Sequence, residues 1–129
     1  MNKFTKKQLA ISNEIIQIVL SDYEEVILFS RFAEIEGFST QPGEKNYLLY
    51  SDHENSILWT GLTSDALKVL QSLQKIEIVE TVYVSPAVYL IEKYYIKFPI
   101  GKPGQTYKKP HWIPCGLTLA AKVRELNYG

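Results

Sequence analysis

The chain has 129 residues, of which 46% are hydrophobic and 22% charged, and its 14 basic and 14 acidic side chains give a net charge of zero. This composition is ordinary for one globular domain with its own core, spanning residues 1–129. A single cysteine, Cys115, excludes an intramolecular disulfide, and no apolar run approaches the roughly 18 residues of a membrane span. The first 20 residues also lack the continuous apolar stretch of a signal peptide, so we expect a soluble cytoplasmic protein.

The first predicted element is a helix over residues 5–20. Thr5 and Gln8 have the spacing of a capping box with Thr5 as the N-cap, and Phe4 and Leu9 occupy the two positions of a hydrophobic staple. Apolar side chains then recur over a wide face, which predicts that this helix packs against the rest of the fold.

Residues 22–38 give two conflicting signals. The segment 26–32 is rich in β-branched and aromatic side chains, which favours a strand. The spacings at 21–24 and 22–25 resemble capping boxes, which favours a helix. We expect a strand that ends at Gly37.

The next segments carry clearer signals. Residues 47–51 and 56–60 are typical of a β-hairpin around the polar turn 52–55. Thr63 then has the position of an N-cap for a helix that ends near Lys75.

Partial alternation predicts a strand over residues 76–84, and β-branched and aromatic side chains favour another over 87–98. Residues 99–116 contain four of the six prolines, which predicts an extended loop or an edge segment. A short helix is expected over 118–126. These elements predict an α+β fold with an N-terminal helix, an antiparallel sheet of about four to five strands, a central helix and a short C-terminal helix.

Charge is distributed unevenly along the chain. Residues 9–92 carry 4 basic side chains against 13 acidic ones, whereas no Asp or Glu occurs within residues 93–124. The chain therefore has an acidic body (about 8–92) and a basic flank rich in proline, glycine and aromatic residues (about 93–124). Such a separation creates charged surfaces although the net charge is zero.

Lysines and aromatic side chains are interleaved within residues 93–112. Lysines neutralise phosphates and exposed aromatic rings stack on unpaired bases, which is the combination that a single-strand nucleic-acid binder needs. Alternatively, the aromatic rings face the core while the lysines are solvated, or the basic segment binds the acidic body of its own or a neighbouring subunit. The sequence pI of about 6.7 is unlike that of a typical nucleic-acid binder. The candidate binding residues, for protein or nucleic acid, are Lys97, Lys102, Tyr107, Lys108, Lys109, His111 and Trp112.

Other functional patterns are weaker. The helix after Thr63, followed by strands and a basic turn, is compatible with a winged helix. The turn 52–54 holds three metal-ligand residue types without a second ligand cluster, and His111 and Cys115 form a Cys–His pair only if the fold brings them together. Three acids on the predicted strands are conceivable in a nuclease core, but cross-strand ion pairs with nearby lysines explain them more simply: Glu77, Glu80 and Glu92.

Each candidate catalytic or metal pattern is explained more simply by ordinary packing or by solvent exposure. We therefore lean against an enzyme and expect no metal and no cofactor. We predict a small non-enzymatic binding or adaptor protein that uses its charge-separated, Tyr/Trp-rich surface for protein docking or self-association. The alternative hypothesis is a nucleic-acid-binding protein, single-strand or winged-helix-like, that binds through residues 93–112. No membrane partner is expected.

Overall fold

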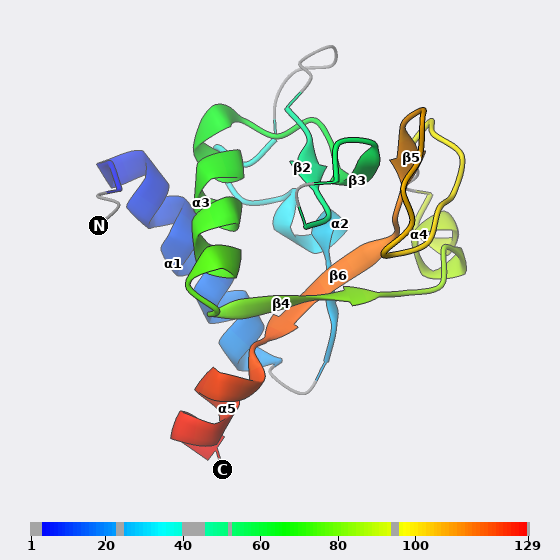
Figure 1. The fold of residues 1–129 in the computed structure, drawn as a ribbon. Helices are drawn as coiled ribbons and strands as arrows, with labels where there is room; N and C mark the ends of the chain where they lie inside the picture. The colour runs from blue at the N-terminus through cyan, green and yellow to red at the C-terminus, as the bar shows by residue number, and fades with distance from the viewer. Residues whose placement is uncertain (1–3, 23–24, 40–45, 52, 94–95, 129) are drawn as a thin grey trace.

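The computed structural model describes residues 4–22, 25–39, 46–51, 53–93 and 96–128, over which the chain forms the predicted α+β fold (Figure 1). No helix in these ranges is both long enough and apolar enough to cross a bilayer. In chain order the elements are α1 (Lys6–Ser21), β1 (Ile27–Leu28), α2 (Phe29–Phe32), β2 (Leu48–Leu49), β3 (Ser56–Trp59), α3 (Ser64–Lys75), β4 (Val79–Tyr83), α4 (Ala87–Ile91), β5 (His111–Trp112), β6 (Cys115–Leu119) and α5 (Ala121–Tyr128).

The two longest helices begin where their capping residues predict. The Gln8 amide donates a hydrogen bond to the Thr5 hydroxyl (3.2 Å), and the Thr5 amide donates one to the Gln8 side chain (3.0 Å), which confirms the capping box. Thr63 caps α3 by accepting a hydrogen bond from the Ala66 amide. Leu9 is 50% exposed and lies outside the packed face of α1.

The strands form two three-stranded sheets instead of the single antiparallel sheet that the sequence predicts. In the first sheet β6 lies between β1 and β4, and both pairs are antiparallel. In the second, β3 pairs with β2 as the predicted hairpin and runs parallel to β5. The parallel pair arises because the chain returns to β3 only after α3, β4 and α4, rather than through a tight turn. One residue of the predicted hairpin turn, Asp52, lies outside the described residues.

The strand predicted to end at Gly37 is wrong beyond Leu28, because the chain continues as the helix α2. The register of β1 and β6 places Phe29 opposite Cys115. The Tyr89 hydroxyl bridges these two residues, accepting a hydrogen bond from the Phe29 amide and donating one to the Cys115 carbonyl. The Tyr89 hydroxyl therefore takes the place of a direct main-chain hydrogen bond between Phe29 and Cys115, and β1 ends there.

The strand predicted over 87–98 is also wrong, since its first part is the helix α4. The Ala87 amide donates a hydrogen bond to the Ser85 hydroxyl, and Pro86 has the helical φ that favours proline at a helix start. These start signals outweigh the strand-like composition of the segment. Residues 94–95 lie outside the described part of the chain.

The proline-rich segment 99–116 is mostly a loop, and it contains β5 at the edge of the second sheet, as its prolines predict; it also contains the start of β6, which is the central strand of the first sheet. Pro110 and Pro114 lie just outside the two strands, where a missing amide breaks no ladder bond. Thr118 belongs to β6 and does not begin the last helix, which starts at Ala121.

The core joins both sheets to the helices. α1 packs against α3 and β6, and α3 also contacts β4 and β2. Aromatic rings then continue the core toward α4, with centroid separations of 5.7 Å for Phe29 and Trp59, 5.4 Å for Trp59 and Tyr89, and 5.5 Å for Tyr89 and Trp112. In Figure 1, α4 and β5 lie at the opposite end of the view from α1.

Candidate functional site

The basic residues of the flank lie mainly on a loop, residues 96–110, that packs against β5. The Trp112 amide donates a hydrogen bond to the Pro99 carbonyl, and the Gly101 amide donates one to the Trp112 carbonyl, both at 2.8 Å. A Cβ on Gly101 would lie 2.9 Å from the Tyr107 ring, so this close packing requires glycine. The start of the loop is thereby fixed to the strand.

Tyr107 connects the rest of the loop through its side-chain and main-chain hydrogen bonds. Its hydroxyl accepts a hydrogen bond from the Lys102 amide (2.8 Å) and donates one to the Gln105 side chain (3.1 Å). Its carbonyl accepts a hydrogen bond from the Asn55 side chain (2.8 Å). The ring of His111 stacks on the Tyr107 ring, with centroids 3.8 Å apart. The two rings are therefore engaged with each other.

The structure places the predicted binding residues in three environments. Tyr107 and His111 are half-buried in the stack described above. Trp112 is only 2% exposed, which contradicts its predicted role as a stacking platform, because its ring packs against Tyr89 in the core. The remaining four residues are exposed lysines: Lys97, Lys102, Lys108 and Lys109.

A buried tyrosine anchors α4 beside this loop. Tyr89 is fully buried, and its hydroxyl accepts a hydrogen bond from the Phe29 amide (2.9 Å) and donates one to the Cys115 carbonyl (2.6 Å). Burial raises the pKa of the Tyr89 phenol above its ordinary value, so the hydroxyl stays protonated and keeps its donor role. One side of α4 is thus fixed to the core and the other side faces solvent.

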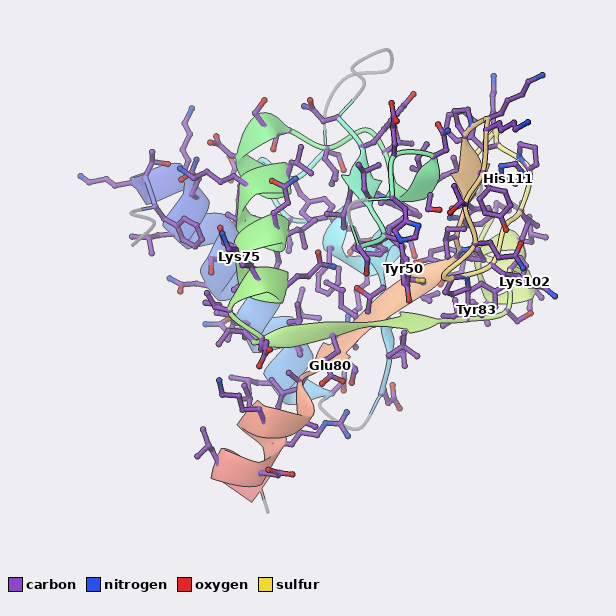
Figure 2. The ribbon with its side chains drawn as sticks, in the orientation of Figure 1. Tyr50, Lys75, Glu80, Tyr83, Lys102 and His111 are labelled. Carbon is purple, nitrogen blue, oxygen red and sulfur yellow. The ribbon has the colours of Figure 1, made fainter. Side chains whose placement is uncertain are left out.

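Apolar side chains on α4 and its neighbours are exposed to solvent. Figure 2 shows Tyr83, Lys102 and His111 at the same end of the molecule. We call this end the flank surface and define it by its apolar members, which are 37–81% exposed, and its lysines: Tyr83, Val88, Leu90, Ile91 and Ile100 with Lys93, Lys97, Lys102, Lys108 and Lys109. The predicted site residues did not include these apolar side chains. In the strand predicted over 87–98, neighbouring residues such as Leu90 and Ile91 would point to opposite faces and would not form one surface.

The candidate catalytic groups do not form a site. Cys115 is fully buried, and burial raises the pKa of its thiol to about 12, so the thiol is not a nucleophile at neutral pH. His111 faces Tyr107 instead, and its Nδ1 lies 2.8 Å from the Lys109 carbonyl. Among the described residues no three His, Cys, Asp or Glu side chains are grouped to hold a metal.

The three acids that fit a nuclease core have separate structural roles. Glu77 forms an ion pair with Lys122 (3.9 Å). Glu80 accepts a hydrogen bond from the Ala121 amide (3.1 Å) at the start of α5, where a negative charge is favourable. The Glu92 carboxylate accepts a hydrogen bond from the Ser30 hydroxyl (3.5 Å).

The helix α3 does not form part of a winged helix in the described residues. After β4 the chain forms α4 rather than the second strand of a hairpin. On α3, Ser72 is buried and the Gln74 side chain donates a hydrogen bond to the Thr81 hydroxyl (2.9 Å), so neither is free to read a base edge.

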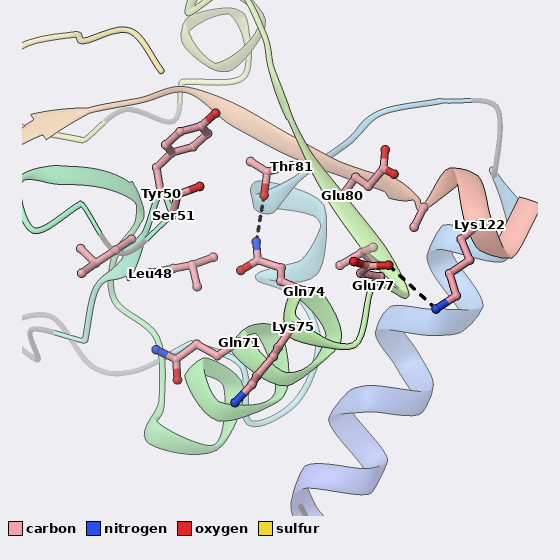
Figure 3. A pocket seen from close by; sticks show the side chains of 13 residues that line it. Leu48, Tyr50, Ser51, Gln71, Gln74, Lys75, Glu77, Glu80, Thr81 and Lys122 are labelled. Carbon is pink, nitrogen blue, oxygen red and sulfur yellow. Dashed lines mark hydrogen bonds and ion pairs between the residues drawn. The ribbon is translucent and has the colours of Figure 1, made fainter. Parts of the chain in front are cut away.

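A groove of about 860 Å³ lies between the two sheets (Figure 3). α3 contributes Gln71, Gln74 and Lys75 to it. We call it the polar groove. The rest of its lining comes from β2 and the two residues after it, from the chain around β4, and from the start of α5: Leu48, Leu49, Tyr50, Ser51, Glu77, Val79, Glu80, Thr81, Ala120 and Lys122. A second groove, of about 870 Å³ beside α1, contains four acids: Glu14, Glu34, Glu36 and Asp65.

Comparisons of the chain with models of known protein families, with curated proteins and with solved structures find no match.

Proposed function

We propose that this protein is a non-enzymatic binding module that docks a protein partner with an acidic, amphipathic surface onto the flank surface. The observation that carries the proposal is the exposure of Leu90 and Ile91 on a helix that Tyr89 fixes to the core. Exposed apolar side chains on a rigid element are typical of interaction sites, because they lose little conformational entropy on binding.

The charges of the flank surface determine the kind of partner. Its lysines stand in a stretch of sequence, residues 93–124, that contains no acidic residue. Rim lysines around an apolar centre accelerate association with a negatively charged surface and disfavour positively charged partners. A partner with carboxylates around an apolar stripe therefore complements the site.

The same residues support nucleic-acid binding less well. Base stacking needs an accessible aromatic face, but Trp112 is buried and the rings of Tyr107 and His111 stack on each other. Lysines alone provide only a salt-sensitive attraction to phosphates. The exposed apolar residues of α4 have no role in such a complex.

The proposal is tested by fluorescence anisotropy with two labelled helical peptides, one with leucine on one face and glutamate on the other, and one with lysine replacing glutamate. We expect binding of the glutamate peptide only, and a loss of at least about tenfold when Lys97, Lys102, Lys108 and Lys109 are changed to Ala. The matched control changes four other lysines: Lys3, Lys6, Lys7 and Lys68. Labelled single-stranded RNA, titrated in parallel, should bind more weakly than the glutamate peptide.

Two results would contradict the proposal. The first is equal binding of both peptides, and the second is tighter binding of RNA that is lost in the flank variant. Light scattering at low and high salt completes the test. A salt-sensitive oligomer would show that the acidic partner is a second copy, which offers its groove of four acids.

A further inference from the structure

β4 is an edge strand with no second strand partner among the described residues. Hydrogen bonds from the Ala120 amide to the Ile78 carbonyl (3.0 Å), and from the Val84 amide to the Pro114 carbonyl (2.9 Å), set the phase of its ladder with β6. In an antiparallel ladder the residues of an edge strand alternately turn their main-chain groups toward the partner and away from it. The outward-facing residues of β4 are therefore Val79, Thr81 and Tyr83. Val79 is only 3% exposed, so the accessible part of this edge lies at Thr81 and Tyr83.

The polar groove runs between β4 and the edge strand of the other sheet, β2. The Tyr50 amide donates a hydrogen bond to the Ser56 carbonyl (2.9 Å), so the preceding residue, Leu49, turns its main-chain groups away from β3. Both edge strands line the groove, and α3 contributes polar side chains between them (Figure 3). The groove is thus bordered by one edge strand from each sheet.

The edge of β4 lacks the features that normally prevent strand pairing. Natural edge strands are protected by proline, lysine, a bulge or a covering element. The sequence of β4, Val79–Tyr83, contains neither proline nor lysine, and its pairing with β6 has no bulge. Its one charged residue, Glu80, is occupied at the start of α5. This edge is therefore open to an added strand.

The charges in the groove leave one cation without a partner. Glu77 pairs with Lys122, and Glu80 accepts the Ala121 amide. Lys75 has no ion pair with any residue that the structure describes. Gln71, one turn earlier on α3, lies beside it in Figure 3. A ligand that carries a carboxylate would complement this part of the groove.

We propose that the polar groove binds an extended polypeptide segment as an added strand on β4, with an Asp or Glu side chain of that segment facing Lys75. Main-chain hydrogen bonds to Thr81 and Tyr83 would provide the affinity, and the carboxylate would provide the selectivity. This site is separate from the apolar face of α4 and does not depend on the function proposed for the flank surface.

The test uses a phage library of random linear peptides selected against the intact protein, and the recovered peptides are then synthesised. We expect them to contain an acidic residue and to slow amide hydrogen exchange at Thr81 and Tyr83 at least about tenfold, whereas Glu80 and Val82 already exchange slowly in the free protein. If the peptides leave these two amides unprotected, or if the amides are protected without peptide, the proposal is wrong.

Two variant pairs sharpen the result. Thr81→Pro removes the outward amide and Thr81→Val retains it, while both lose the hydrogen bond from Gln74. We expect Thr81→Pro to bind at least about tenfold more weakly than Thr81→Val. Lys75→Glu should weaken binding severalfold, whereas Lys68→Glu, an exposed position on α3 outside the groove, should not.

Equal affinities within both pairs would overturn the proposal. So would a concentration-dependent dimer that Thr81→Pro abolishes, since a second copy would then occupy the edge. Leu90→Ser/Ile91→Ser serves as the control that separates the two sites, because it should leave peptide affinity unchanged.

Discussion

The phenol of Tyr89 donates a 2.6 Å hydrogen bond to the main-chain carbonyl of Cys115, and in doing so it replaces a rung of the β1–β6 ladder. The same hydroxyl accepts the Phe29 amide that would otherwise face Cys115. This bridge ends β1, starts α2 and fixes α4 to the first sheet. The proposed docking helix and the core therefore share one buried side chain.

Removing this hydroxyl should destabilise the fold. In Tyr89→Phe the ring still fills its site, but the buried Phe29 amide loses its partner. We expect the free energy of unfolding to fall by about 1–3 kcal/mol, the usual effect of leaving a buried polar group unpaired. Urea denaturation measures this, with Tyr83→Phe as a control at an exposed tyrosine. Equal effects of the two substitutions would show that the bridge contributes nothing specific.

Glu77 follows α3 in a left-handed conformation, where glycine is normally preferred. The amides of Glu77 and Ile78 donate to the carbonyls of Gln74 and Leu73, which is the Schellman arrangement. We expect Glu77→Gly to raise the free energy of unfolding by about 0.5–1 kcal/mol, because it relieves the strain. Glu77→Ala keeps the strain and loses only the exposed ion pair, so it should change stability little. A gain of the same size in both variants would point to charge rather than strain.

Two glycines should respond differently to alanine. In β6, a Cβ on Gly116 would lie 2.6 Å from the Ile27 carbonyl oxygen, so Gly116→Ala should destabilise the protein by about 2–3 kcal/mol through overpacking. At Gly104 no atom lies within 4 Å of the added Cβ, but φ is +82°. Gly104→Ala should therefore cost only about 1 kcal/mol of backbone strain. Thermal unfolding of both variants checks the order, and the reverse order would contradict the packing around β6.

Alkaline pH should destabilise the protein through Cys115. Burial raises the pKa of this thiol to about 12, whereas its pKa in the unfolded chain is about 8.5. Above the lower value the unfolded chain releases a proton that the folded chain keeps, so stability falls as pH rises toward 12. When the pH is raised from 8 to 10, we expect the free energy of unfolding of Cys115→Ala to fall by about 1–2 kcal/mol less than that of the wild-type protein. Identical pH profiles would show that the thiol ionises in the folded state.

The elements that sequence predicted well are those set by local signals. The side chains of Thr5 and Thr63 cap their helices by accepting hydrogen bonds from amides three residues later in the chain. The hairpin of β2 and β3 closes within a few residues. Such interactions are visible in the order of the residues alone. The helix α4 has local start signals at Ser85 and Pro86, whereas the helix α2 depends on a contact between Phe29 and Tyr89, 60 residues apart. No local pattern reveals that contact.

The candidate site was predictable in its charge but not in its apolar part. The lysines of the flank are exposed, as their chemistry indicates. Trp112 and Tyr107 have both an apolar ring and a polar atom, so sequence alone does not decide whether they face the core or solvent. The exposed side of α4 depends on the burial of Tyr89, which fixes the helix with Leu90 and Ile91 toward solvent.

Binding of a protein partner to the apolar face of α4 can be checked by comparing two variants of the protein. The affinity of the glutamate–leucine peptide is measured for Leu90→Ser/Ile91→Ser and for Leu126→Ser, which changes an equally apolar and 80% exposed side chain on α5. We predict a loss of at least about tenfold in the α4 variant and no change in the α5 variant. Unchanged affinity in the α4 variant, in a protein that remains folded, would contradict the docking function.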